Sequence, residues 1–437
     1  MGFFCEVMEE HIQNLYQLFL QHPKVSTDTR KNVHDTLFFA LSGNTFNGNE
    51  FAESALQKGA AFAVIDDANF KKSEKYFLVP DVLKALQQLA AHHRKMSGVH
   101  VLAITGSNGK TTTKELLATV LQSEKKIIAT KGNLNNHIGV PLTLLSIKGE
   151  TETAVVEMGA NHIGEIAALC EIAQPNSGLI TNIGKAHLEG FGSFEGVVTA
   201  KNELFVFLSE TNGMAIVNAD DELLMKLSDT LKRTTYGISS GEVQGKLLET
   251  HPFLKLQWSS DNETHICNTN LYGSYNFSNL MAAVTIGKYF GISPENINQS
   301  IADFVPNDNR SQQLKTEKNK IILDAYNANP VSLSEAIKSF AAFNPEKPWL
   351  ILGDMFELGK DSIAEHQSII RQVEETGFEN VLLVGEDFYE QRKTGRFLFF
   401  ESTEQIEAYL KMNPIEDASI LIKGSRGMHL ETLVKYL

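Results

Sequence analysis

The sequence predicts an α/β protein with three domains. Its 437 residues are too many for a single hydrophobic core. Short apolar, β-branched runs alternate with segments whose apolar residues recur at helical spacing, which is typical of mostly parallel sheets. The pattern divides into a small α/β domain at 1–97, a central domain with a mostly parallel sheet at 98–308 and a Rossmann-like domain at 309–437.

The composition limits the classes of partner. Hydrophobic residues make up 42% and charged residues 21%, as in ordinary globular proteins. The net charge of −14 argues against nucleic acid and anionic membranes as partners, and it predicts that an anionic substrate needs a local basic pocket. No apolar run approaches the roughly 18 residues of a spanning helix, and the first residues lack a basic stretch. We therefore expect a cytoplasmic protein.

The cysteines indicate neither a disulfide framework nor a zinc site. Cys5, Cys170 and Cys267 are odd in number and far apart in the sequence. We expect buried, reduced thiols.

The first domain shows strand patterns at 37–41 and 61–65 and an amphipathic helix at 82–96. Residues 27–30, which include Thr29 and Arg30, either cap a turn or bind an anion. From the sequence alone, the turn is favoured.

A glycine-rich loop opens the central domain and predicts a nucleotide site. It lies between a strand pattern at 99–104 and a helical pattern at 114–121. Glycines let backbone N–H groups approach a phosphate, a lysine reaches the outer phosphates, and a threonine hydroxyl can hold Mg²⁺. The loop is shorter than the usual pattern, with two rather than four residues before its Gly-Lys pair. Its candidate nucleotide-binding residues are Gly106, Ser107, Asn108, Gly109, Lys110, Thr111 and Thr112.

Two further strands of this domain end in candidate metal ligands. Glu157 lies toward the C-terminal end of the strand pattern at 153–160, and His187 follows the strand pattern at 177–184. Ligands of open α/β sheets bind outside the carboxyl ends of strands, and Mg²⁺ prefers oxygen ligands. Glu157 is thus the expected ligand type, whereas His187 alone is more often a satisfied polar side chain. Asn276 and Asn279 either read a base edge or cap a helix.

Residues 236–271 predict a small antiparallel sheet, and the third domain then resumes the strand–helix alternation. Its strand patterns lie at 320–324, 348–352, 381–384 and 419–422, without a Gly-x-Gly-x-x-Gly fingerprint. Polar loops follow three of them, at 324–330, 353–359 and 423–427, and we expect them to share one edge of the sheet. Three such loops at one edge favour a binding site.

The motifs together resemble the Mur ligases, ATP-dependent amide-forming enzymes of cell-wall precursor synthesis. The resemblance covers nearly the whole chain and is carried by the shortened loop at 105–111 and by residues 133–141, 324–330 and 352–359. The last two segments are most similar to the member that joins D-alanyl-D-alanine to UDP-N-acetylmuramoyl-tripeptide. The resemblance implies reaction through an acyl phosphate, in which positioning and charge neutralisation replace a nucleophilic side chain.

The resemblance also implies roles for single residues. Lys110 would hold the outer phosphates of ATP, and Thr111 and Glu157 would hold one Mg²⁺. His187 and a carbamylated Lys201 would hold a second, although the pattern alone reads Lys201 as a surface helix lysine. Catalytic roles would fall to Lys110, His187, Lys201 and Asn136.

Other roles implied by the resemblance concern substrate binding. Asn135 and Asn136 would place the tripeptide carboxylate, and Asn276, Arg310 and Asp324 would contact adenine, ribose or phosphate. The uridine diphosphate would bind near Thr29 and Arg30, and the dipeptide would face Asn327, Asn329, Ser425 and Arg426. The chain departs from the family pattern at Asn47-Gly48-Asn49, where Asp-Gly-His is frequent, and at Asn309, where Gly is common. A monomer is the expected state.

Two alternatives remain open. Another ligase of the same fold, such as a tripeptide synthetase or an enzyme that adds glutamate to folate, would share the central motifs, but the loop at 324–330 argues against it. A nucleotide-driven switch would hydrolyse ATP without an amine acceptor and would leave the loops of the third domain unexplained.

Overall fold

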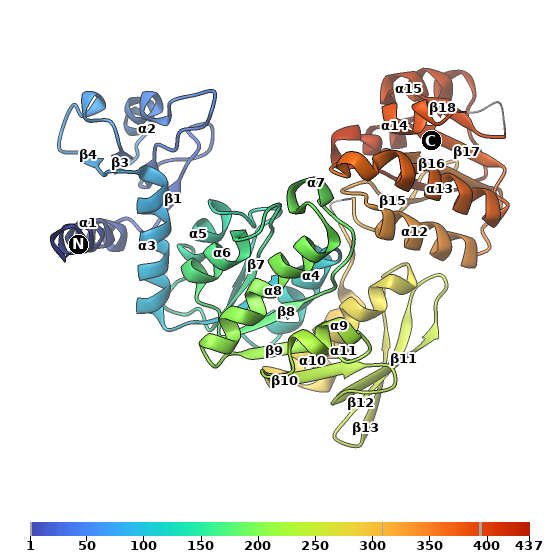
Figure 1. Cartoon of the computed structure of the whole chain (residues 1–437), viewed down its shortest axis with the longest axis horizontal. Coiled ribbons are helices and arrows are strands. Elements are labelled where there is room, and N and C mark those ends of the chain that lie inside the picture. The colour runs from blue at the N-terminus through green and yellow to red at the C-terminus, as the bar shows by residue number, and fades with distance from the viewer. Residues whose placement is uncertain (1, 308, 393–395) are drawn as a thin grey trace.

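The computed structural model describes residues 2–307, 309–392 and 396–437, with side chains from residue 11 onward. Three separate sheets lie in a row, and each falls within one of the three predicted domains (Figure 1). The mixed α/β class with mostly parallel sheets is therefore confirmed. The domain boundaries stay predictions, and residue 308 lies outside the described residues.

The first sheet is parallel, with the strand order β1-β2-β3-β4. A long helix, α1, precedes it, which the sequence patterns did not predict. The strands are β1 (Val25–Ser26), β2 (Leu37–Phe39), β3 (Phe62–Ile65) and β4 (Tyr76–Leu78), and the helices are α1 (Gly2–Gln21), η1 (Gly48–Phe51), α2 (Ala52–Gln57), η2 (Ala68–Phe70) and α3 (Val82–Ser97).

Helix α3 fastens this domain to the central one. Its buried Arg94 donates hydrogen bonds to the carbonyl oxygens of Ala173 and Gln174 at 3.1 and 3.0 Å and to Asn176 Oδ1 at 2.7 Å. Apolar residues of α1 and α3 share one core cluster with the central domain. The first two domains therefore pack as a continuous body.

The central sheet has the strand order β13-β12-β11-β10-β9-β8-β5-β7-β6. Its strands are β5 (His100–Thr105), β6 (Ile127–Ala129), β7 (Thr153–Glu157), β8 (Ser177–Ile180), β9 (Met214–Asn218), β10 (Lys232–Gly237), β11 (Val243–Glu249), β12 (Lys255–Ser260) and β13 (Glu263–Asn268). Its helices are α4 (Lys110–Gln122), α5 (Gly139–Leu144), α6 (Glu165–Ala173), α7 (Leu188–Phe191), α8 (Phe194–Glu210), α9 (Glu222–Leu227), η3 (Ser274–Asn276), α10 (Phe277–Tyr289) and α11 (Pro294–Asp303).

The antiparallel strands β11 to β13 correct one expectation. They do not form a separate small sheet, because β11 pairs in parallel with β10 and so extends the central sheet. The alternation of residues along these strands predicted their antiparallel pairing, but pairing with a distant strand leaves no local pattern.

The third sheet has the strand order β14-β15-β19-β16-β17-β18, in which only the β14–β15 pairing is antiparallel among the described residues. The sequence patterns missed β14 and β18. The strands are β14 (Gln312–Lys315), β15 (Lys320–Asp324), β16 (Pro348–Gly353), β17 (Asn380–Val384), β18 (Leu398–Phe400) and β19 (Ser419–Lys423). The helices are α12 (Pro330–Ala342), η4 (Gly359–Asp361), α13 (Ser362–Thr376), α14 (Glu386–Glu390), α15 (Thr403–Met412), η5 (Arg426–Met428) and η6 (Leu430–Tyr436).

Strand register brings the predicted loops together. Asp324 at the end of β15 and Leu352 near the end of β16 both pair with Lys423 at the end of β19, so the three polar loops leave one edge, as expected. In the central sheet, Ile104 pairs with Glu157, which places the glycine-rich loop beside the end of β7.

Neither described cysteine is available for a disulfide in this fold. Cys170 and Cys267 are free and buried, and burial raises the pKa of each thiol to about 12. Cys5 lies outside the residues whose side chains are described. Among the described residues, no helix combines the length and the apolar character needed to cross a bilayer.

Candidate active site

The glycine-rich loop connects β5 to α4 in a conformation that needs its glycines. Gly106 has φ +142° and Gly109 has φ +77°, both in the region that L side chains rarely adopt. A Cβ at Gly109 would lie 2.5 Å from Asn279 Oδ1, and one at Gly106 would lie 2.1 Å from Thr181 Oγ1. The backbone can thus approach a phosphate where α4 begins.

Lys110 is the first residue of α4 and folds back over this loop. Its Nζ donates hydrogen bonds to the carbonyl oxygens of Gly106 at 2.6 Å and Ser107 at 3.0 Å. Desolvation lowers the pKa of Lys110 to about 8, with Glu157 opposing the shift and Arg310 adding to it. The ammonium is therefore still mostly charged at neutral pH and can pair with an anion.

Glu157 is buried at the end of β7, 1% exposed. Its Oε1 accepts hydrogen bonds from Thr111 Oγ1 at 3.2 Å and Asn135 Nδ2 at 2.7 Å. Its Oε2 has no hydrogen-bond partner among the described residues. A buried carboxylate oxygen without a partner is costly. This orphaned oxygen beside a threonine hydroxyl is the donor set that Mg²⁺ prefers, so the residues present fit the expected ion.

Lys114 is a component of this site that the sequence patterns missed. Its side chain is fully buried, with Nζ 2.7 Å from Glu115 Oε1 and 4.0 Å from Glu157 Oε2. Its spacing in the sequence could have indicated this position. Residues four apart share one helix face, and Lys114 follows Lys110, which points into the site, by four residues. Lys114 supplies a fixed positive charge next to Glu157.

His187 follows β8 and contacts Glu357 of the third domain. His187 Nδ1 lies directly against Glu357 Oε2. The hydrogen bond from His187 is the main reason that the pKa of Glu357 lies below its usual value. The sequence motif included Glu357, but no pattern paired it with His187.

Lys201 is a correction to the sequence pattern, because it lies on α8 but is only 1% exposed. Its Nζ is 3.5 Å from the carbonyl oxygen of Ala160 and 5.2 Å from the centre of the Phe191 ring. Desolvation, with a smaller contribution from Lys110, lowers the pKa of Lys201 to about 7. Burial therefore favours the neutral amine of Lys201 over its ammonium form.

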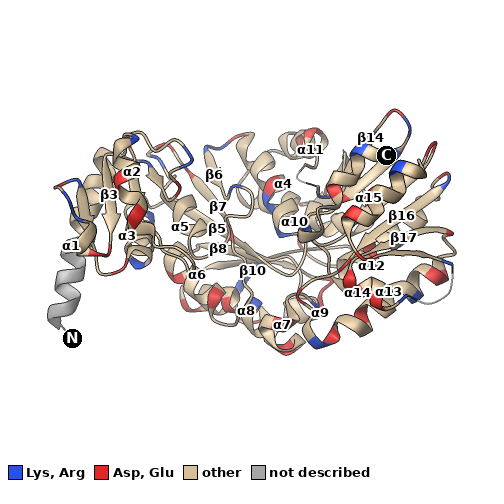
Figure 2. Cartoon of the chain, turned by 90° about the horizontal axis from the view of Figure 1, so that it is seen from above, with Lys and Arg blue, Asp and Glu red and all other residues tan. Residues whose placement is uncertain are grey.

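A cavity of about 1320 Å³ is lined by Lys110, Glu157 and His187 and extends to the other two domains. It exceeds the size of a typical small-molecule site and suits several substrates together. The expected basic pocket is only partly present, because the cavity is lined by both basic and acidic side chains. The basic ones include Lys110, Arg310, Lys423 and Arg426, and the acidic ones include Glu157 and Asp324. Elsewhere, charges of both signs are spread over all three domains (Figure 2).

Comparisons with known proteins agree along nearly the whole length of the chain. The family models described as "Mur ligase family, catalytic domain", "Mur ligase middle domain" and "Mur ligase, glutamate ligase domain" match residues 24–94, 104–287 and 309–426. The Bacillus subtilis protein named UDP-N-acetylmuramoyl-tripeptide–D-alanyl-D-alanine ligase is 36% identical over 434 residues, covering 94% of this chain and 92% of that relative. The chain belongs to the Mur ligase family.

Other relatives support the assignment. The Escherichia coli protein of the same name is 34% identical over 423 residues, covering 94% of this chain and 93% of the relative. Among solved structures, MurF from Acinetobacter baumannii superposes with a TM-score of 0.85 at 30% identity, covering 94% of this chain and 92% of that chain. MurF from Thermotoga maritima in complex with ADP has a TM-score of 0.84 at 26% identity, covering 94% and 96%.

In this Mur ligase, the residues predicted for the adenine side line the cavity but also bond to one another. Asn276 Nδ2 donates to the carbonyl oxygen of Tyr272 at 2.8 Å, and Asn279 Nδ2 donates to Asn276 Oδ1 at 2.9 Å. Neither makes a side-chain cap at the start of α10, so capping does not explain them. Arg310 stacks on the ring of Tyr326 at 3.5 Å, which presents a flat surface to the cavity.

Of the residues predicted to face the dipeptide, three line the cavity and one does not. Asn327, Asn329 and Arg426 line the cavity, and Asn329 Nδ2 donates to Asn108 Oδ1 of the glycine-rich loop at 2.6 Å. Ser425 does not line it, because its buried hydroxyl accepts the N–H of Phe356 at 2.9 Å. Asp324 lines it while pairing with Lys423 Nζ at 2.7 Å.

The residues predicted to place the tripeptide carboxylate both lie at the cavity wall. Asn135 and Asn136 line the cavity, and Asn136 Oδ1 additionally accepts the N–H groups of Ile138 and Gly139 at the start of α5. The remaining predicted residues are placed as follows: Thr112 and the loop residues Ser107 to Thr111 line the cavity, whereas Gly106, Lys201, Thr29 and Arg30 do not.

Arg30 makes the turn that the sequence favoured. Its backbone N–H and its guanidinium both donate to Asp28, at 2.9 Å, and its side chain is 88% exposed. These bonds lower the pKa of Asp28 to about 2. The guanidinium still faces solvent and so remains accessible to a phosphate.

Proposed function

We propose that this Mur ligase joins D-alanyl-D-alanine to UDP-N-acetylmuramoyl-tripeptide with the consumption of ATP, in peptidoglycan precursor synthesis. One observation carries the proposal: a single cavity connects the glycine-rich loop with Asn327, Asn329 and Arg426 of the third domain. Relatives named for this reaction match nearly the whole chain, including that domain.

The reaction consists of phosphoryl transfer followed by acyl transfer. A carboxylate oxygen of the tripeptide attacks the γ-phosphorus of ATP, which forms an acyl phosphate and releases ADP. The amine of the dipeptide attacks the acyl carbon, phosphate leaves, and the amine loses a proton. Lys110 holds the transferred phosphoryl group, and Asn135 and Asn136 place the attacking carboxylate next to it.

Mg²⁺, when bound, neutralises the phosphate charge that develops during transfer. Thr111 and Glu157 would hold one ion, and His187 would hold a second together with Lys201 as its carbamate. The burial of Lys201 supports carbamylation, since a neutral amine combines with CO₂ and releases a proton to give an oxygen anion.

On the acceptor side, the guanidinium of Arg426 would form a bidentate pair with the carboxylate of the dipeptide. Its Nη1 already donates to the Tyr326 hydroxyl at 3.2 Å, which fixes the fork at the cavity wall. Because the cavity lies between domains, closure would exclude water from the acyl phosphate. The proposal includes action as a cytoplasmic monomer, which light scattering and cell fractionation would test.

The deciding assay measures phosphate release with ATP, Mg²⁺ and the muramyl-tripeptide nucleotide, with D-alanyl-D-alanine present or omitted. We expect release to require both substrates and the product mass to equal that of the pentapeptide nucleotide. Lys110→Met should abolish release, whereas Lys131→Met, at an exposed lysine outside the cavity, should not. Phosphate release that is indifferent to the dipeptide would contradict the proposal.

A further inference from the structure

The turn that carries His187 is joined to the third domain by several contacts. Besides the pair between His187 and Glu357, the backbone N–H of Glu189 donates to the carbonyl oxygen of Glu357 at 3.3 Å. Lys185 Nζ lies 2.9 Å from Glu365 Oε1. Helix α7, which follows His187, accordingly lies on the side of the central domain that faces the third domain (Figure 1).

Both partners of the central contact have an unusual backbone conformation. His187 has φ +52° and Glu357 has φ +64°, in the left-handed region where residues other than glycine are uncommon. Such conformations persist only when the surroundings hold them, and they concentrate at functional sites. Two loops from different domains thus each hold a strained residue, and the two side chains meet.

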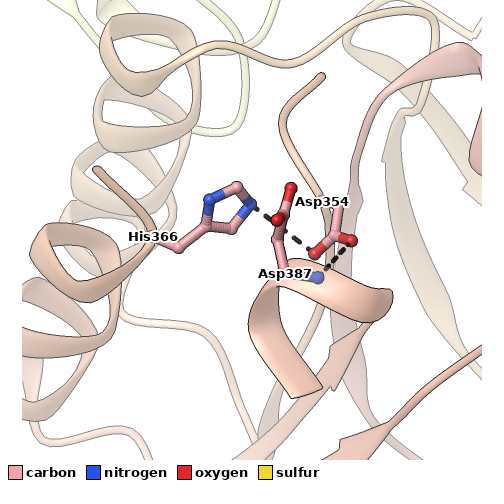
Figure 3. Close-up of side chains that lie close together, drawn as sticks. All are labelled: Asp354, His366 and Asp387. Carbon is pink, nitrogen blue, oxygen red and sulfur yellow. Dashed lines mark hydrogen bonds and ion pairs between the residues drawn. The ribbon is translucent and has the colours of Figure 1, made fainter. Parts of the chain in front are cut away.

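The loop that carries Glu357 is anchored from behind by a buried carboxylate, Asp354 (Figure 3). Asp354 Oδ2 accepts the N–H of Asp387 and Oδ1 accepts the N–H of Phe388, each at 2.9 Å. Its carbonyl oxygen accepts the N–H of Ser425 at 3.1 Å, which ties the loop to the neighbouring loop after β19.

His366 fixes the next residue of the same loop. Its Nε2 accepts the N–H of Met355 at 3.1 Å, and its Nδ1 donates to the carbonyl oxygen of Ser362 at 2.8 Å. Asp354, His366 and Asp387 have the composition of a metal site. Because the His366 nitrogens and the Asp354 oxygens already have protein partners, the cluster is a structural anchor for the loop that presents Glu357.

We propose that Glu357 is a positioning residue for His187, supplied by the third domain. Its carboxylate lies against His187 Nδ1, and an acceptor at that nitrogen selects the tautomer whose Nε2 is free to act as a ligand. Docking of the third domain onto the turn before α7 then completes the second magnesium site. The inference rests on the proposed function only for the assignment of His187 as a magnesium ligand.

Three variants distinguish the positioning of His187 by Glu357 from a general effect of contact between the two domains. Glu357→Asn suits the left-handed backbone, but its side chain is one methylene shorter and cannot reach His187. Glu357→Gln keeps both the length and an acceptor oxygen. Glu365→Gln weakens the interdomain ion pair between Lys185 and Glu365 and serves as the matched control because Glu365 touches no predicted ligand.

The first readout is the tautomer of His187 in the full chain without metal, from the ¹⁵N spectrum of histidine-labelled protein, with the signal assigned by its loss in His187→Gln. We expect the Nδ1–H form in the unaltered protein, in Glu357→Gln and in Glu365→Gln, and a mixture of tautomers in Glu357→Asn. The second readout is Mn²⁺ binding in the presence of ADP, measured by electron paramagnetic resonance. We expect Glu357→Asn to weaken one Mn²⁺ site by about tenfold or more.

The outcomes distinguish this inference from the proposed function. If Glu357→Asn matches the unaltered protein in both tautomer and Mn²⁺ affinity, Glu357 does not position His187. If Glu365→Gln has the same effect as Glu357→Asn, the interface as a whole is responsible and the inference is overturned. If the tautomer shifts as expected but the unaltered enzyme forms no pentapeptide nucleotide, the positioning role stands and the proposed substrate assignment fails.

Discussion

Replacing Lys114 with Met tests how the buried charges around Glu157 are balanced. Met retains most of the side-chain length but removes the ammonium that lies 4.0 Å from Glu157 Oε2. At about 4 Å, an effective dielectric constant of about 20 gives an attraction of roughly 4 kcal/mol, and breaking a buried pair typically costs about 3–5 kcal/mol. We expect the free energy of unfolding to fall by about 3 kcal/mol and the melting temperature of the central domain by roughly 6–12 °C.

The assay for Lys114→Met is calorimetric unfolding with and without ADP and Mg²⁺. Because a bound cation gives Glu157 a new partner, we expect ADP and Mg²⁺ to stabilise the variant more than the unaltered protein. Lys338→Met is the control, since Lys338 Nζ lies 2.9 Å from Glu335 Oε1 but its side chain is 61% exposed, where ion pairs contribute little. Equal losses at both positions, or no loss at Lys114, would refute the argument.

Three further changes probe the cavity. Gly109→Ala would place a Cβ 2.5 Å from Asn279 Oδ1, so we expect ADP affinity in titration calorimetry to fall roughly tenfold or more. Because Lys201 has a pKa of about 7 and only its neutral amine takes up CO₂, we expect activity at limiting bicarbonate to fall as the pH drops through 7, and a ¹³C carbamate signal to fade with it. Asn329→Ala removes the cap of α12 and the bond to Asn108, so we expect about 1 kcal/mol less stability in urea unfolding and a higher KM for the dipeptide.

The sequence predicted the parts of the site that depend only on residues close together in the chain. The glycine-rich loop has its own spacing, and the position of Glu157 at a strand end follows from the parallel sheet, where carboxyl ends share an edge. The burial of Lys201 was missed although its spacing signals it, because Lys201 stands four residues after Val197 and three before Leu204, on the buried face of α8. A charged residue type favours an exposed position, and that expectation outweighed the spacing. The contact of His187 with Glu357 depends on how two domains dock, and no periodicity encodes that.

The assembled site explains why a chain with a net charge of −14 buries several cations in one place. Lys110 and Lys114 both lose hydration beside a single carboxylate, Glu157, whose Oε2 has no hydrogen-bond partner among the described residues. Lys201 is buried near Lys110, and the carboxylates that act on its charge are Glu165 and Glu203. Burying charges in this way does not stabilise a fold by itself. When phosphate oxygens contact the lysines and a cation contacts Glu157, these contacts offset the free-energy cost of desolvating the charged groups. The incomplete pairing of Glu157 is therefore a property that favours the ligand-bound state over the free enzyme.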